Sequence, residues 1–346
     1  MTDVKQILED DVKVVRENLE VFKEQTKPKL GEFEDVADQL HSLTWEYTSR
    51  EWKGLRSSFV LRTVAAFGGN MGIALDLASL MQLEQDWILP HDDIEDKSEL
   101  RRGKPALHRM EGVGEDIAIN VGDGMSKIAD RLFLKPLKMI PEERKWELYE
   151  FRNQLLTETT QGQHFEMTMR KHPLSSISLA AVLLIYDRKT GTYTYELPCG
   201  YGLYLSKLDS MDILRRRMIF RDYGAPFQIE DDYLNLRAKP GSGYGKEFAD
   251  DILEGKWTVF AERAERLLKG QDLERHHQIY GNRSASVEER KEEIELFDKY
   301  GVFNEAMAIQ AALWAQARSR AHGLVPRTEE GKNLIAVLDY GCDRPK

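Results

Sequence analysis

The chain has 346 residues, 41% hydrophobic and 31% charged, so it can bury a sizeable core and keep a well-hydrated surface. Its net charge of −10 excludes an extended surface for nucleic acid or anionic membrane, which would need clustered Lys and Arg. Two cysteines are too few for a disulfide framework, the N-terminus is charged rather than apolar, and no apolar run reaches the length of about 18 residues that spans a membrane. We therefore expect a soluble, cytoplasmic protein.

Helical periodicity dominates the chain from its start. Apolar residues at three- and four-residue spacing predict an amphipathic helix over residues 4–24. Residues 72–83 are apolar on nearly every face, which predicts a buried central helix that continues to Leu89. Further helices are expected over residues 117–138, 149–170, 176–189, 211–236, 256–268 and 302–322.

Strand-like patterns are almost absent. The nearest candidates, residues 183–186 and 192–195, lie within helical contexts. The polar stretch 269–290 is short enough to be a surface connection, and the capping-box spacing of Ser286 and Glu289 places a helix start at its end. With no internal repeat and no linker in view, we expect one all-α domain over residues 1–346.

An acidic cluster, DDIED, follows the predicted central helix at residues 92–96. In a helix, Asp92 and Asp96 lie one turn apart on the same face, and Asp93 flanks them. Three carboxylates at one helix end repel one another unless a cation neutralises them, and hard oxygen ligands of this kind suit Mg²⁺. Taken alone, the cluster is equally compatible with a solvated helix end.

A second acidic cluster, QIEDDYLN, lies far along the chain at residues 228–235. Asp231 and Asn235 share a helix face by the same spacing, with Asp232 beside them. Apolar residues precede the cluster, and acidic side chains are costly to bury unless they are paired or bound to a metal. Two such clusters in one all-helical chain favour a metal site over coincidence.

Basic segments accompany both clusters. Arg and Lys donate hydrogen bonds to phosphate oxygens, so these segments predict a diphosphate site, although each one taken alone is typical of an ordinary surface. The segments are Lys53-Gly54-Leu55-Arg56, Arg101-Arg102-Gly103-Lys104, Lys189-Thr190 and Gly255-Lys256.

The joint pattern resembles the trans-isoprenyl diphosphate synthases, the group of farnesyl and geranylgeranyl diphosphate synthases, over residues 53–256. The segments that carry the resemblance are, in order, DDIEDKSELRRGKP, AINVGD, QGQHFE, KT, FQIEDDYLN and DILEGKWT. The resemblance implies a helical bundle of the isoprenoid synthase type with a central active-site cavity. It also implies a homodimeric prenyltransferase that joins isopentenyl diphosphate head to tail to an allylic diphosphate.

The resemblance assigns roles to the matching positions. Three Mg²⁺ ions are expected on the oxygen ligands Asp92, Asp93, Asp96, Asp231, Asp232 and Asn235. The allylic diphosphate is expected on Arg101, Lys189, Lys246 and Lys256, and isopentenyl diphosphate on Lys53, Arg56, Gln85 and Arg102. Thr190 and Gln228 are expected beside the developing carbocation, completing a catalytic set with Arg101, Lys189 and Lys256. His91 is interpreted as a structural residue rather than as the base.

Product length is expected to depend on Trp87, five residues before Asp92 and about 7.5 Å further along a helix that rises about 1.5 Å per residue. Its indole would form the floor of the elongation pocket. A large Trp87 beside a smaller Ile88 resembles the archaeal-type geranylgeranyl pattern, so we favour geranylgeranyl over farnesyl diphosphate as product. The alternative is that Trp87 belongs to the core.

The chain departs from the family pattern at several positions. Glu51-Trp52-Lys53-Gly54 stands where the family often has Gly-Gly-Lys-Arg, and Glu166 stands where Asp is usual. Pro90 should remove a helix hydrogen bond to Asp86 and kink the chain. Two other functions stay open, a terpene cyclase on the same fold and a non-catalytic subunit of a heteromeric synthase. The basic isopentenyl diphosphate set argues against the first, and the two complete acidic motifs argue against the second.

Overall fold

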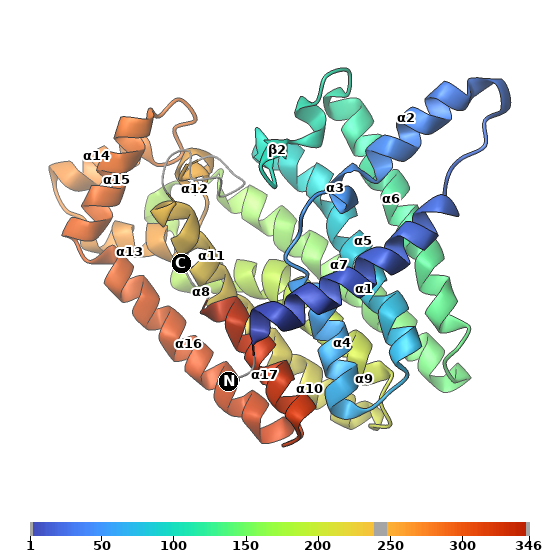
Figure 1. The fold of residues 1–346 in the computed structure, drawn as a ribbon. Helices are drawn as coiled ribbons and strands as arrows, with labels where there is room; N and C mark the ends of the chain where they lie inside the picture. Colours follow the sequence, from blue (N-terminus) through green and yellow to red (C-terminus); the bar gives the residue numbers. More distant parts are fainter. Residues whose placement is uncertain (1–2, 239–247, 344–346) are drawn as a thin grey trace. The chain divides into compact units, whose positions relative to one another are not determined.

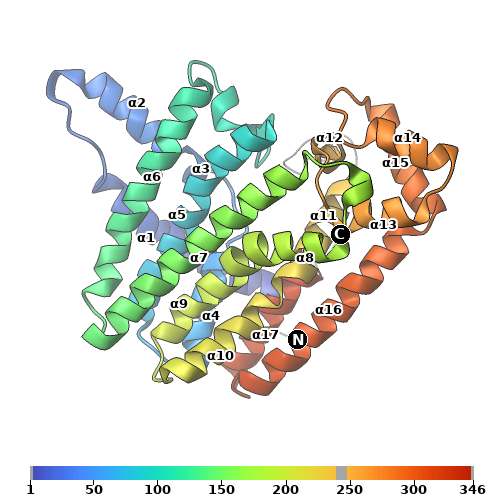
Figure 2. The same ribbon diagram turned by 180° about the vertical axis from the view of Figure 1, so that it is seen from behind.

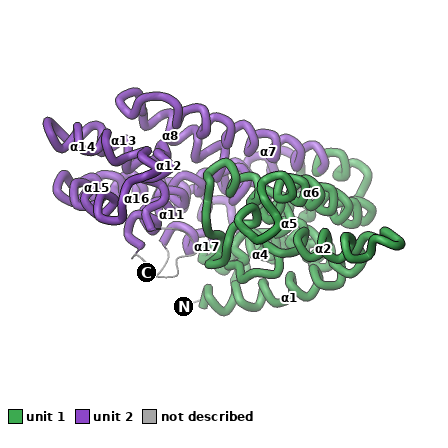
Figure 3. The backbone as a smooth tube through the Cα atoms, turned by 90° about the horizontal axis from the view of Figure 1, so that it is seen from above, with its two compact units in different colours: residues 1–148, 198–209, 326–337 green, residues 149–197, 210–325, 338–346 purple. Residues whose placement is uncertain are grey.

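The computed structural model of the protein describes residues 3–238 and 248–343, and almost all of its secondary structure is helical (Figures 1 and 2). Contacts divide the chain into two compact units (Figure 3), which are described separately: residues 1–148, 198–209 and 326–337 form unit 1, and residues 149–197, 210–325 and 338–346 form unit 2. The chain passes between the units within α7 (Glu142–Met169), α9 (Leu197–Tyr204) and α17 (Glu329–Cys342), and also between residues 209 and 210 and between residues 325 and 326. The single domain expected over residues 1–346 stays a prediction. None of the described helices is both long enough and apolar enough to span a membrane.

Unit 1 is organised around α5 (Met71–Asp96), the predicted buried central helix, which packs against α1, α4 and α6. Asn70 caps its N-terminus by accepting the N–H groups of Gly72 and Ile73. The helix continues through Pro90, past the predicted end at Leu89, so the first acidic cluster forms its last turns. The other helices of this unit are α1 (Val4–Glu24), η1 (Gly31–Phe33), α2 (Glu34–Thr44), α3 (Glu46–Ser49), α4 (Leu55–Phe67), η2 (Leu107–Arg109) and α6 (Gly114–Leu137).

A short hairpin follows α5 and was not predicted. Lys97 ends the helix in the left-handed conformation at φ 55°. The strands β1 (Leu100–Arg101) and β2 (Lys104–Pro105) then pair antiparallel, with Arg101 opposite Lys104. Arg102 and Gly103 form the turn with positive φ angles of 52° and 75°, as a two-residue hairpin loop of type I′ requires. The hairpin folds the basic segment back over the acidic end of α5.

Unit 2 is built around α11 (Gly224–Arg237), which packs against α16 and against a π-helix, η4 (Tyr186–Glu196). Its core includes a cluster of aromatic rings in which Phe303 contacts Tyr233, Phe260 and Phe297. The other elements of this unit are η3 (Leu174–Ser176), α8 (Leu179–Ile185), α10 (Ser210–Arg221), α12 (Asp250–Glu254), α13 (Val259–Leu267), α14 (Gln271–Ile279), α15 (Val287–Lys299) and α16 (Val302–Leu324).

Three predicted segments of unit 2 differ from the structure. The helix predicted over 176–189 is α8 followed by the π-helix, and the run 211–236 is divided at Asp222 and Tyr223 into α10 and α11. The stretch 269–290, predicted as a surface connection, contains α14. The capping box of Ser286 and Glu289 is confirmed at the start of α15, where both reciprocal hydrogen bonds are present.

Candidate active site

The first acidic cluster lies at the C-terminal end of α5, where the helix dipole disfavours negative charge. Arg101 compensates for it from the hairpin: its Nε donates to Asp93 Oδ1 at 2.7 Å, and its Nη2 contacts both Asp93 and, at 3.1 Å, Asp92. Asp93 and Asp96 are buried, while the Asp92 side chain keeps 16% of its exposure. The sequence-predicted cluster and one of its predicted cationic partners are therefore brought together.

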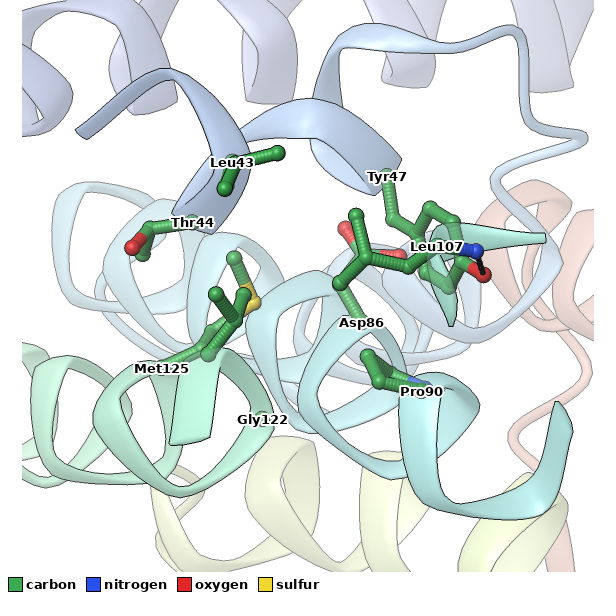
Figure 4. A pocket seen from close by; sticks show the side chains of 9 residues that line it. Leu43, Thr44, Tyr47, Asp86, Pro90, Leu107, Gly122 and Met125 are labelled. Carbon is green, nitrogen blue, oxygen red and sulfur yellow. Dashed lines mark hydrogen bonds between the residues drawn. The ribbon is translucent and has the colours of Figure 1, made fainter. Parts of the chain in front are cut away.

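Two residues that the sequence did not single out hold this arrangement. The buried Tyr47 of α3 donates its hydroxyl to Asp93 Oδ2 at 2.6 Å and accepts the N–H of Leu107 at 2.7 Å; Figure 4 shows Tyr47 beside Leu107, near Asp86 and Pro90 of α5. Burial and the nearby Asp93 raise the pKa of the Tyr47 phenol well above its usual range, so the hydroxyl remains a donor. Arg50 donates to the carbonyls of Arg101 and Pro105 at 2.7 and 2.8 Å and so fixes both strands of the hairpin.

Arg102, predicted to bind isopentenyl diphosphate, is oriented by a buried carboxylate. Its Nη2 lies 2.9 Å from Asp86 Oδ1, and its Nη1 donates to the Tyr47 carbonyl at 2.5 Å. The Gln82 amide donates to both Asp86 oxygens, so the carboxylate is fixed from α5 itself. Asp86 is a further residue that sequence reasoning missed, because its partner Arg102 is 16 residues away in the chain.

The remaining residues of the predicted isopentenyl diphosphate set also lie in unit 1. Lys53 and Arg56 flank the N-terminus of α4, and Gln85 lies on α5. Gly54, between Lys53 and Arg56, has φ 69°. A Cβ there would lie 2.2 Å from the Val12 side chain of α1, so the position requires glycine.

Two of the departures from the family pattern have a structural role in unit 1. Trp52 packs under the Arg16 guanidinium, 5.5 Å from its ring centroid. Pro90 lines a space between α2, α3, α5 and α6 that is too small for a water molecule (Figure 4). Both residues therefore contribute to the packing of unit 1.

The second acidic cluster lies on α11, as predicted, and a chain of hydrogen bonds joins it to the π-helix. Thr190 donates to Gln228 Oε1 at 2.7 Å, and the Gln228 amide donates to Asp232 Oδ1 at 2.8 Å. The hydroxyl of the buried Tyr186 donates to Asp232 Oδ2. Burial, with the carboxylates of Asp251 and Asp231, raises the pKa of Asp232 well above its usual range. The expected catalytic residues Thr190 and Gln228 are thus joined to the predicted metal site.

The same cluster is connected to the segment that follows it. Asn235 donates its amide to Asp250 and accepts the N–H of Asp251 at 3.4 Å. Both acceptor and donor belong to α12, so the last residue of the predicted motif sets the position of the segment that leads to Lys256.

The predicted lysines lie at the two ends of one series of ion pairs. Lys189 lies 2.7 Å from Glu166, and Lys256 lies 2.9 Å from Glu254 and 3.0 Å from Asp251. Arg170 of unit 2 contacts Glu166 and lies 3.6 Å from Glu254. Glu166, which stands where the family usually has Asp, therefore contacts both Lys189 and Arg170. Lys246 lies outside the described residues.

The π-helix that carries Lys189 and Thr190 is braced by Arg221. The guanidinium donates twice to Asp187 at 2.6 Å, and to Glu158 and Glu196 at 2.9 and 3.0 Å. Asp187 and Glu196 lie near the two ends of this π-helix, so the Arg221 side chain contacts both ends. π-helical turns are rare and frequently mark functional sites. No residue pattern predicted this one.

The predicted chain-length residue is held in place from its own helix. Trp87 Nε1 donates to Glu84 Oε2 at 2.8 Å, and the indole packs edge-on to His91 with ring centroids 6.2 Å apart. The imidazole of His91 lies 3.3 Å from Asp123 and fills the space where Gly122 has no Cβ, which agrees with a structural role. Ile88 is half-buried.

The donor set at both clusters consists of carboxylate and amide oxygens, which fit Mg²⁺. Among the described residues, no three His, Cys, Asp or Glu side chains converge closely enough to hold a metal by themselves. Mg²⁺ is commonly held by one or two carboxylates and completes its shell with water and substrate phosphate.

Comparison with known proteins identifies the family of the chain. The polyprenyl synthetase family matches residues 37–297. A geranylgeranyl pyrophosphate synthase of Geoglobus acetivorans is 27% identical over 99% of this chain and 99% of its own, and a short chain isoprenyl diphosphate synthase of Methanothermobacter thermautotrophicus is 27% identical over 84% and 86%. The crystal structure of a geranylgeranyl pyrophosphate synthetase from Pyrococcus horikoshii has a TM-score of 0.81 and 26% identity, covering 97% of this chain and 99% of that one. The expected all-helical fold and prenyltransferase class are confirmed: the chain belongs to the polyprenyl synthetase family.

Proposed function

We propose that the chain is a Mg²⁺-dependent synthase that condenses isopentenyl diphosphate with an allylic diphosphate, with geranylgeranyl diphosphate as the main product. The observation that carries this proposal is that Arg101 of the hairpin contacts Asp92 and Asp93 in unit 1, while in unit 2 Asn235 of the second cluster is hydrogen-bonded to α12, where Lys256 contacts Asp251. Such a combination suits a diphosphate, whose charge needs both metal and side-chain donors.

Asp92 and Asp96 at one cluster, and Asp231 and Asn235 at the other, would hold Mg²⁺. When bound, the metal neutralises charge on the leaving diphosphate and so lowers the barrier to breaking the allylic C–O bond. Arg101, Lys189 and Lys256 add hydrogen-bond donors to the same group. Their present carboxylate partners keep them oriented until the substrate arrives.

The side chains of Thr190 and Gln228 present oxygen atoms that stabilise positive charge at the allylic carbon. The alkene of isopentenyl diphosphate attacks that carbon, a C–C bond forms, and one proton leaves to the released diphosphate. Lys53, Arg56, Gln85 and Arg102 hold the second diphosphate, and this fixed geometry removes most of the entropic cost of the encounter. No side-chain nucleophile takes part.

Product length is assigned to Trp87. Its hydrogen bond to Glu84 and its contact with His91 fix the indole, so the ring forms a rigid boundary rather than a movable one. The adjacent Ile88 has a smaller side chain than the indole. This arrangement supports geranylgeranyl diphosphate as the main product and farnesyl diphosphate as the next.

The proposal includes a homodimer in the cytoplasm. Unit 1 exposes large apolar side chains in α6, in the segment after it and at the start of α7, which is typical of an interaction surface. They are Ile117, Ile119, Leu134, Met139 and Trp146.

Product analysis tests the proposal. The purified chain is incubated with Mg²⁺, isopentenyl diphosphate and, in separate reactions, dimethylallyl, geranyl and farnesyl diphosphate. Linear geranylgeranyl diphosphate is expected from all three. Farnesyl diphosphate as the end point would contradict the length assignment alone. Cyclic or alcohol products formed without consumption of isopentenyl diphosphate would replace the synthase with a terpene cyclase, and no turnover by the chain alone would indicate a non-catalytic subunit.

A further inference from the structure

The two acidic clusters share a feature that neither motif contains. In each cluster the second aspartate of the adjacent pair, Asp93 or Asp232, is at most 3% exposed and accepts a hydrogen bond from a buried tyrosine. Each tyrosine precedes its aspartate by 46 residues. The tyrosines are Tyr47 in unit 1 and Tyr186 in unit 2.

The hydrogen-bond pattern is the same at both positions. Each phenol donates to the Oδ2 atom of its aspartate, while a second donor occupies Oδ1: the Arg101 guanidinium at Asp93, and the Gln228 amide at Asp232. A buried carboxylate needs such donors because it has lost its hydration. Both oxygens of each aspartate are therefore already engaged by the protein.

Each phenol oxygen also accepts the backbone N–H of the first residue of a following helix. Leu107 N–H, at the start of η2, donates to Tyr47 at 2.7 Å, and Val259 N–H, at the start of α13, donates to Tyr186 at 3.1 Å. Such N-terminal N–H groups have no partner within their own helix. Both bonds follow a basic segment in the chain: Leu107 comes after the Arg101–Arg102 hairpin, and Val259 comes after Lys256.

We propose that Tyr47 and Tyr186 are equivalent positioning residues, each of which ties the second aspartate of one cluster to the chain that follows the basic segment of the same unit. This inference rests on the proposed function. Each tyrosine fixes the rotation of a helix that ends in, or carries, the metal-binding carboxylates, and it sets the distance of that helix from the cationic segment. Asp93 and Asp232 act as anchors for this link.

The test uses Tyr47→Phe and Tyr186→Phe in the full chain, because each change removes one oxygen atom and keeps the ring. Tyr300→Phe is the matched control: its hydroxyl also donates to a carboxylate, Asp272 at 2.7 Å, outside both clusters. Melting temperatures are measured over a Mg²⁺ titration with inorganic diphosphate present and no organic substrate. The Mg²⁺ concentration that gives half of the melting shift is compared among variants, and the Mg²⁺ dependence of condensation is measured in parallel.

Both cluster variants should need roughly tenfold more Mg²⁺ for the half-maximal shift, an effect typical of losing one hydrogen bond to a charged group, and Tyr300→Phe should match the parent within about twofold. If Tyr47→Phe and Tyr186→Phe lower the melting temperature but leave the half-maximal Mg²⁺ concentration unchanged, the tyrosines are merely structural and the inference is wrong. In an Asp93→Asn background, Tyr47→Phe should have little further effect on the Mg²⁺ requirement, and a full additive effect would also overturn it. Failure of the proposed function looks different, because the parent itself would then show neither the shift nor condensation.

Discussion

Arg221 offers a direct perturbation of the segment that carries Lys189 and Thr190. We consider Arg221→Met, which keeps the length of the side chain and removes its charge. Three carboxylates lose a hydrogen-bond donor in this variant, and they differ in the partners that they keep. Asp187 is 43% exposed and can recruit water, Glu158 keeps Arg188 at 3.2 Å, and the 1% exposed Glu196 keeps Arg217 at 3.5 Å.

The expected loss of stability follows from Glu196. Removing one partner of a buried ion pair typically costs about 3–5 kcal/mol, and because Arg217 remains in range we expect about 3 kcal/mol. The π-helix also loses the side chain that holds both of its ends. A displacement of catalytic groups by about 1 Å can cost roughly 100-fold in rate, so kcat/KM for the allylic substrate should fall by about 10- to 100-fold.

The loss of stability caused by Arg221→Met should depend on pH. Burial raises the pKa of Glu196 in the parent, although Arg221 opposes the effect, and the variant should raise it further. A carboxyl whose pKa is higher in the folded state loses folded-state stability as the pH rises, because ionisation favours the unfolded chain. The difference in unfolding free energy between parent and variant should therefore be larger near about pH 7.5 than near about pH 5.5.

Urea unfolding at both pH values, with steady-state kinetics, measures these effects. Arg275→Met is the control, since Arg275 also bridges two glutamates, Glu289 and Glu292, at a more exposed site in the same unit. It should change stability little and leave kcat/KM at the parent value. A loss below about 1 kcal/mol for Arg221→Met, equal at both pH values and without a kinetic effect, would refute the reasoning, because that is the value of an exposed ion pair.

Substitutions at three further positions test other contacts. Arg170→Met should lower kcat/KM for the allylic diphosphate by about 10-fold, with Arg170→Lys intermediate, because the series of ion pairs between the two lysines is broken; steady-state kinetics equal to the parent would contradict this. Asp86→Asn should raise KM for isopentenyl diphosphate about fivefold without changing KM for the allylic substrate, because Arg102 loses a charged partner; a lower KM would mean that the carboxylate repels the substrate more than it orients Arg102. Trp87→Ala should shift the products to longer chains, because the indole is the proposed boundary of the elongation pocket, and chromatography of the products measures this. An unchanged distribution of product lengths would place the indole in the core.

Local signals predicted much of this structure. The apolar run before Asp92 gave the buried helix α5, and the spacing of Ser286 and Glu289 gave a helix start, because caps and periodicity are short-range properties. The two acidic clusters were found as helical motifs for the same reason.

Long-range contacts explain what the sequence left out. Tyr47 and Tyr186 act on partners 46 residues away, and Arg221 acts on Asp187 across 34 residues, so no spacing rule identifies them. The residue pattern of the π-helix predicts an ordinary helix, because a π-helix differs from an α-helix in its backbone hydrogen bonds. It coincides with a close approach of Gly191 and Gly224, where a Cβ on Gly224 would lie 2.3 Å from the Gly191 Cα.

The central claim is that this chain couples ionisation of an allylic diphosphate to capture by isopentenyl diphosphate. A single-turnover reaction measures it most directly, with the purified chain in excess over geranyl diphosphate, with Mg²⁺ and isotopically labelled isopentenyl diphosphate. Diphosphate release and label incorporation into a longer prenyl diphosphate should proceed together, at one label per diphosphate, and chelation of the metal should stop both. Diphosphate released without incorporated label would contradict the claim.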